Sequence, residues 1–183
     1  MRVGIGYDIH RLAPRSRRSA SAAVNGLKLG GVAIPFDRRL VGHSDADVLL
    51  HAIADALLGA IGAPDLGELF PPSDPKYQGM DSRWFVRRAE GLIRESGWRV
   101  GNLDATVIAD EPRLGPHKRR IRESISRLLR VSPAEVSVKG KTTEGLPPGA
   151  GGIAVHAVVL LVPARRVRPR PAPRSRRGSR SVG

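Results

Sequence analysis

The first residues of the chain alternate between apolar and polar positions, and this period of two predicts a half-buried strand. Asp8 and His10 lie two positions apart, so their side chains leave the same face of that strand. The apolar side chains leave the opposite face; they are Val3, Ile5, Tyr7 and Ile9. A short apolar stretch at Leu27–Pro35 has two glycines at its centre and predicts a hairpin.

Three later segments carry apolar residues at helical spacing. The first helix contains His51, with its N-cap expected at Ser44 or Asp45 and its end near Gly59. The second runs from about Ser82 to Ser96. The positions that mark the third are Ile121, Ile125, Leu128 and Leu129. Three more strands are expected, at Val100–Asp110, Val136–Lys139 and Ile153–Val162, with loops at Asp65–Tyr77 and Gly145–Gly152.

Strands and helices are mixed, but hairpins open and close the chain, and this order disfavours a doubly wound parallel sheet. We therefore predict an α/β fold of the α+β type, with a single mixed four-stranded sheet, an N-terminal hairpin, and helices on one face of the sheet. The strand Ile153–Val162 is apolar on both sides, as a doubly buried strand would be. A closed ring of three subunits would bury a sheet face that no helix covers.

Composition narrows the class of protein. The 183 residues suit one domain, and because there is no cysteine, metal ligands must be His or carboxylate. No apolar run is long enough to span a membrane and no signal segment precedes the first strand, so a cytoplasmic location is expected. Residues 164–183 form an Arg/Pro-rich tail with eight arginines and no acidic residue. These arginines supply 8 of the 14 net positive charges of the chain, and we predict that the tail is disordered.

Asp8, His10 and His51 are candidate metal ligands. A carboxylate and two imidazoles leave a fourth position open, as catalytic zinc sites do, and zinc, manganese and magnesium all fit this donor set. Asp47 and Asp55 lie one helical turn from His51 on either side and are expected to orient it by hydrogen bonds. The alternative is a histidine that is simply held by carboxylates on its own helix.

Two segments suit phosphate groups. His43 and Ser44 lie where the first helix begins, and helix N-termini favour anions. Lys139–Gly145 offers lysines, the paired hydroxyls of Thr142 and Thr143, and Glu144 as a ligand for a harder cation such as Mg²⁺. The alternative for the first segment is that its acids only cap the helix. The alternative for Lys139–Gly145 is an ordinary polar turn. Neither a P-loop nor a dinucleotide fingerprint is present, because the glycine spacing and the following element do not match.

Four motifs in order resemble the family of 2-C-methyl-D-erythritol 2,4-cyclodiphosphate synthases. They are Gly-Tyr-Asp-Ile-His at 6–10, His-Ser-Asp-Ala-Asp-Val-Leu-Leu-His-Ala at 43–52, Phe-Pro-Pro-Ser-Asp-Pro at 70–75 and Lys-Thr-Thr-Glu-Gly at 141–145. The resemblance covers residues 1–163, which it implies are one catalytic domain. The Arg15–Ala23 stretch looks like an insertion, and the tail is additional.

The resemblance implies a small α/β subunit in a homotrimer, with active sites between neighbouring subunits. It implies conversion of 4-diphosphocytidyl-2-C-methyl-D-erythritol 2-phosphate to 2-C-methyl-D-erythritol 2,4-cyclodiphosphate with release of CMP. The enzyme would be a phosphorus-oxygen lyase of non-mevalonate isoprenoid precursor biosynthesis. It would use one Zn²⁺ per subunit and Mg²⁺ or Mn²⁺ with the substrate phosphates.

Residue roles follow from the same motifs. Asp8, His10 and His51 match the zinc ligands, Glu144 matches the ligand of the second metal, and His43 and Thr142 match the catalytic positions. The substrate-binding positions implied are Asp8, Ile9, His10, His43, Ser44, Asp65, Leu66, Gly67, Phe70, Pro71, Pro72, Ser73, Asp74, Ala109, Asp110, Glu111, Pro112, Arg113, Leu114, Gly115, Lys141, Thr142, Thr143 and Glu144.

Three alternatives remain open at the level of sequence. The metal ligands would equally serve another metal-dependent phosphohydrolase acting on a diphosphate. The loop after Glu144 is shorter than is usual in the family and lacks its aromatic and arginine residues, which would suit an inactive relative. The basic tail would suit nucleic-acid binding, but the chain has no interleaved aromatics or recognisable reading motif, so nucleic acid is not expected to be the main partner.

Overall fold

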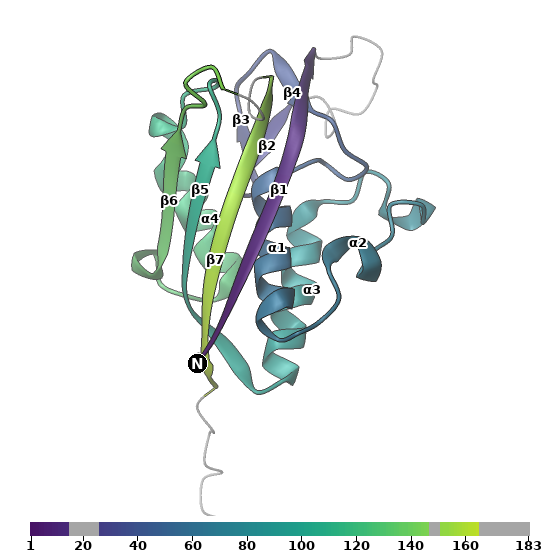
Figure 1. Cartoon of the computed structure of the whole chain (residues 1–183), viewed down its shortest axis with the longest axis vertical. Helices are drawn as coiled ribbons and strands as arrows, with labels where there is room; N and C mark the ends of the chain where they lie inside the picture. Colours follow the sequence, from purple (N-terminus) through teal and green to yellow (C-terminus); the bar gives the residue numbers. More distant parts are fainter. Residues whose placement is uncertain (15–25, 147–150, 165–183) are drawn as a thin grey trace, which may run out of the picture.

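A computed structural model describes residues 1–14, 26–146 and 151–164. Their main sheet has five strands in the order β4-β1-β7-β5-β6 (Figure 1). The strands are β1 (Arg2–Pro14), β4 (Arg38–Leu40), β5 (Trp98–Ile108), β6 (Val136–Lys141) and β7 (Gly152–Pro163). Only β5 and β6 pair in parallel, so the sheet is mixed as predicted.

The prediction of four strands was wrong by one, because β4 was missed. Its three residues pair antiparallel with Leu12, Ala13 and Pro14 at the far end of β1. The segment Arg38–Leu40 has too short an apolar pattern to be recognised as a strand. The predicted hairpin at Leu27–Pro35 is present as β2 (Leu27–Leu29) and β3 (Val32–Ile34), which form a separate two-stranded sheet.

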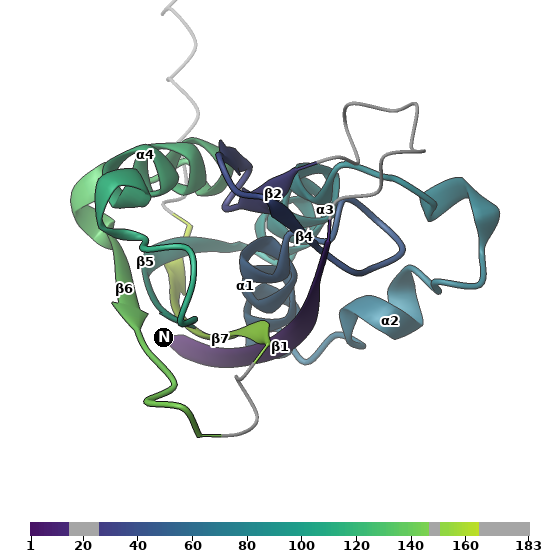
Figure 2. The same ribbon diagram turned by 90° about the horizontal axis from the view of Figure 1, so that it is seen from above.

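The helices lie on one side of the main sheet, as Figure 2 shows. They are α1 (Val48–Ala60), α3 (Ser82–Glu95) and α4 (Lys118–Leu129), with a single-turn helix α2 (Leu66–Leu69) in the segment that was expected to be a loop. Short 3₁₀ turns lie at Pro75–Tyr77, Gly115–His117 and Pro133–Glu135. No helix in the described ranges is both long and apolar enough to cross a membrane.

The N-cap of α1 is Asp47, and neither Ser44 nor Asp45 takes that place. Ala46 has a positive φ of 58°, so the helix begins after it. The Asp47 carboxylate is fully buried; it accepts from Leu50 N at 3.1 Å and from the backbone of the hairpin turn, Gly30 N at 2.9 Å and Gly31 N at 2.6 Å. One side chain therefore caps the helix and fixes the hairpin against it.

Strand β1 packs on α1 through its small residues. Gly4 and Gly6 are buried, whereas Val3, Ile5, Tyr7 and Ile9 are exposed on the other face of the strand. The strand is half-buried as predicted, but the side that the helix covers is the glycine side. Asp8 and His10 continue this side along β1, so they point toward the same helix that carries His51.

Candidate metal centre and pocket

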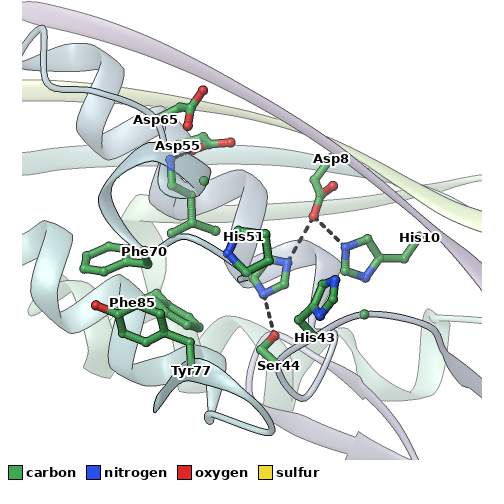
Figure 3. Close-up of a pocket in the computed structure, with 14 residues that line it drawn as sticks. Asp8, His10, His43, Ser44, His51, Asp55, Asp65, Phe70, Tyr77 and Phe85 are labelled. Carbon is green, nitrogen blue, oxygen red and sulfur yellow. Dashed lines mark hydrogen bonds and ion pairs between the residues drawn. The ribbon is translucent and has the colours of Figure 1, made fainter. Parts of the chain in front are cut away.

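Asp8 and the two histidines converge at one point between β1 and α1 (Figure 3). Asp8 Oδ2 lies 3.1 Å from His10 Nε2 and 3.1 Å from His51 Nδ1. One donor atom from each residue lies within 4.8 Å of the other two. Although 43 residues separate Asp8 from His51 in the sequence, the fold brings them together as the sequence predicted.

The electrostatics of the three residues suit a cation. Burial alone would raise the pKa of the Asp8 carboxyl, but hydrogen bonds and charge interactions with His10 and His51 lower it well below its ordinary value. The side chains are mostly buried, with exposures of 25%, 14% and 12% for Asp8, His10 and His51. His10 Nδ1 is buried without a hydrogen-bond partner among the described residues. An ionised carboxylate between two imidazoles therefore fits a metal such as zinc, and these three residues would hold it.

The hydrogen bonds of His51 differ from the prediction. Asp47 is committed to the helix cap and the hairpin, and Asp55 accepts from Leu66 N at 2.8 Å. The outer nitrogen of His51, Nε2, lies 3.0 Å from Ser44 Oγ and 3.0 Å from Ser82 Oγ. The expectation that Asp47 and Asp55 orient His51 by hydrogen bonds was therefore wrong, because both carboxylates bind backbone N–H groups instead.

The metal donors open into a cavity of about 430 Å³, a size typical of small-molecule sites. Predicted substrate-binding residues that line it are Asp8, His10, His43, Ser44, Asp65, Leu66, Gly67, Phe70 and Pro72. Ile9 does not, because its side chain lies on the opposite face of β1, and Pro71, Ser73 and Asp74 are also outside the lining. The sequence interpretation missed Gly42, Tyr77 and Phe85, and it gave Asp55 a role on His51 rather than in the wall.

Aromatic rings form one wall of this cavity. Phe70, Tyr77, Trp84 and Phe85 pack on one another with ring centroids 5.3–5.9 Å apart. Phe85 also approaches the His51 ring edge-on at 6.2 Å. Four of the seven aromatic side chains of the protein are gathered here. Such a cluster fixes the segment after α2 against α3, and three of its rings, Phe70, Tyr77 and Phe85, line the cavity.

The remaining predicted site residues lie around a second, smaller cavity of about 180 Å³. Its lining includes Ala109, Asp110, Pro112, Arg113, Leu114, Gly115, Lys141 and Thr142, joined by Lys118 and Gly140. Glu111, Thr143 and Glu144 belong to the same segments but are not part of the lining. In this chain, His43 and Thr142 therefore line different cavities.

Asp110 ties the two segments of the second cavity together. Its carboxylate accepts from Thr143 N at 2.9 Å and from Thr143 Oγ1 at 2.7 Å, and these hydrogen bonds lower the pKa of Asp110. Thr142 Oγ1 donates to Glu144, whose backbone has a positive φ of 52°. The strand β6, which delivers this loop, is separated from β1 by β7 and β5.

The sequence of this chain also matches a known protein family. The model of the YgbB family matches residues 1–162, which is nearly all of the chain that the structure describes. The chain belongs to the YgbB family.

Several curated relatives are cyclodiphosphate synthases. A 2-C-methyl-D-erythritol 2,4-cyclodiphosphate synthase of Syntrophomonas wolfei is 49% identical over 163 residues, which cover 88% of this chain and 98% of that protein. The synthase of Trichlorobacter lovleyi is 50% identical over 165 residues, with 89% and 99% covered. A solved synthase structure in a CDP-bound form matches with a TM-score of 0.78 at 38% identity, covering 88% of this chain and 100% of that one. The motifs noted in the sequence thus identified the family correctly.

Proposed function

We propose that this protein converts 4-diphosphocytidyl-2-C-methyl-D-erythritol 2-phosphate to 2-C-methyl-D-erythritol 2,4-cyclodiphosphate and releases CMP. The observation that carries the proposal is the convergence of Asp8, His10 and His51 at the wall of a ligand-sized cavity, in a chain that spans its synthase relatives almost end to end. The reaction would be a cyclising phosphorus-oxygen lyase reaction in isoprenoid precursor synthesis.

The chemistry requires charge neutralisation more than covalent assistance. The 2-phosphate attacks the β-phosphorus of the same molecule, so the protein has to bring two anionic groups together in line. A Zn²⁺ held by Asp8, His10 and His51 would neutralise phosphate oxygens and polarise phosphorus. Glu144 would share a second cation, Mg²⁺ or Mn²⁺, with the diphosphate. His43 at the first cavity and Thr142 at the second would donate hydrogen bonds to the phosphate oxygens as charge develops.

The cytidine end of the substrate is assigned to the second cavity. All residues of segment Ala109–Gly115 except Glu111 line it, beside Lys141 and Thr142. A related synthase was solved in a CDP-bound form, which supports a cytidine nucleotide as the ligand. Because the metal donors and this segment line different cavities of one chain, a substrate that touches both would lie between two subunits.

A trimer would bring the two cavities of neighbouring subunits together and would also cover the bare face of the sheet. Val3 and Ile5 on β1 are 66% and 69% exposed, and Val158 on the adjacent β7 is 41% exposed. Apolar side chains aligned on neighbouring strands are costly to leave in water. A closed three-fold arrangement would bury them without leaving a further apolar surface for open-ended assembly.

The experiment that tests this function is CMP release from the cytidyl substrate. We expect release by the wild-type protein with Zn²⁺ and Mg²⁺, and loss of release in a folded His51→Ala variant, which lacks one of the three metal donors. A wild-type protein that leaves the substrate intact would contradict the proposal. A metal-dependent phosphohydrolase would also release CMP but would leave a linear product.

A further inference from the structure

The two ring nitrogens of His51 face different surroundings. Nδ1 lies 3.1 Å from Asp8 Oδ2, on the side where the metal donors converge. Nε2 points away from that side and lies 3.0 Å from Oγ of Ser82, the first residue of α3. Ser82 is completely buried, and its sequence separation from His51 is 31 residues. Histidines that bind a metal through one nitrogen commonly donate the N–H of the other to a fixed acceptor.

Ser82 is itself held in one orientation. Its hydroxyl donates to Asp45 Oδ1, which also accepts from Ser82 N at 3.1 Å. The other oxygen of Asp45, Oδ2, pairs with Lys28 Nζ at 3.0 Å, and the Asp45 side chain is only 5% exposed. An ionised carboxylate has no proton to donate, so the single hydroxyl proton of Ser82 is committed to Asp45. A lone pair of Ser82 Oγ is then left to face His51.

With this proton count, the hydrogen bonds around Nε2 favour one tautomer of the imidazole. If Nε2 carried no proton, its lone pair would face the lone pair of Ser82 Oγ at 3.0 Å, which is repulsive. With the proton on Nε2, His51 donates to Ser82, and the lone pair of Nδ1 faces the Asp8 carboxylate, where a metal ion held by the two residues would accept it. Ser44 Oγ also lies 3.0 Å from Nε2 and 3.3 Å from Ser82 Oγ, and it accepts from Ala46 N at 3.2 Å. When its one hydroxyl proton goes to Ser82 Oγ, Ser44 has none to give His51, and Nε2 is the donor.

We propose that Ser82, anchored by Asp45 and Lys28, is a positioning residue that holds His51 in the tautomer able to bind metal through Nδ1. Lys28 belongs to β2, whose turn is fixed by hydrogen bonds to Asp47 at the N-cap of α1. The hairpin thus supports the metal centre from outside the cavity. This inference rests on the proposed metal site, but it does not depend on which reaction the site performs.

The test compares zinc affinity in three serine variants, starting from metal-free protein and using competition with a chromophoric chelator. Ser82→Ala should bind zinc about 10–100-fold more weakly than wild type, the usual cost of losing such a partner. Ser82→Thr keeps the hydroxyl and should recover most of the affinity. Ser96→Ala removes an exposed hydroxyl just after the end of α3 and should bind zinc as wild type does. Circular dichroism establishes that each variant is folded.

A spectroscopic measurement separates positioning from a merely structural role. In the zinc-loaded wild-type protein, ¹⁵N NMR of the His51 ring should place the proton on Nε2, in slow exchange with solvent. In Ser82→Ala that proton should exchange faster. Unchanged zinc affinity in a folded Ser82→Ala variant, or a proton on Nδ1 in the wild type, would overturn the inference. A wild-type protein that binds no zinc would instead overturn the proposed metal site, and the role of Ser82 with it.

Discussion

Gly6 of β1 lies directly against Ala52 of α1, the residue that follows His51. A Cβ added at Gly6 would lie 1.9 Å from the carbonyl oxygen of Ala52, and one added at Gly4 would lie equally close to that of Ala56. The absence of side chains at these two positions lets the strand approach the helix backbone. This close approach brings Asp8 and His10 within reach of His51.

Gly6→Ala is therefore expected to damage both stability and the metal site. The new methyl group meets backbone that cannot rotate away, so β1 must move from α1, at a cost of about 1–3 kcal/mol in the free energy of unfolding. Urea denaturation measures this loss, and chelator competition should show weaker zinc binding. Gly91→Ala in α3 is the matched control, because nothing lies within 4 Å of the added group. That variant should gain up to about 1 kcal/mol from helix propensity. Equal stabilities for the two variants would contradict the packing account.

Glu144→Gln should reduce turnover strongly while leaving zinc content unchanged. Glu144 lies on the loop after β6 and is not among the residues that line the cavity of the zinc donors. Removing its charge should weaken the second cation only, and we expect turnover to fall by about a hundredfold or more. Raised Mg²⁺ should recover part of the activity. Elemental analysis measures the zinc, and CMP release measures the turnover. A variant with wild-type turnover at low Mg²⁺ would rule out this role for Glu144.

Two inactive variants should restore activity when they are mixed. His51→Ala damages the first cavity and Thr142→Ala the second, so in the proposed trimer each variant alone should be inactive. Unfolding and refolding the two together creates interfaces at which an intact metal centre faces an intact Thr142. Activity should return to a sizeable fraction of wild type, and native mass spectrometry should show mixed trimers. Mixed trimers without activity would mean that one subunit supplies the whole site.

The apolar and polar pattern of the sequence predicted much of this arrangement, because the spacing of residues within a single strand or helix determines which face each side chain occupies. Alternation on β1 placed Asp8 and His10 on one face, and helical spacing placed His51 on α1. Side-chain chemistry made the three residues candidate metal ligands, the family resemblance implied that they converge, and the fold brings them together. Local patterns did not reveal that the other site residues divide between two cavities, because this depends on the sheet order that separates β1 from β6. Only the family resemblance implied it, through active sites between neighbouring subunits.

Other features depend on contacts that sequence patterns do not reveal. Ser82 begins a helix that the sequence predicted, but nothing local shows that its hydroxyl reaches His51 on another helix. Asp47 lies one helical turn from His51 in the sequence and was therefore expected to orient it. In the fold, both of its carboxylate oxygens accept hydrogen bonds from the backbone of Gly30 and Gly31. The strand β4 exists only because the end of β1 extends far enough to pair with it.

Phosphorus NMR of the product shows whether the protein forms a cyclic diphosphate, which is the step that separates a synthase from a phosphohydrolase. The wild-type protein, supplied with the cytidyl substrate, Zn²⁺ and Mg²⁺, should yield CMP and a product whose two phosphorus nuclei are coupled to each other, because both belong to one cyclic diphosphate. A product with two uncoupled phosphate signals beside CMP would show hydrolysis to a linear bisphosphate and would contradict the account.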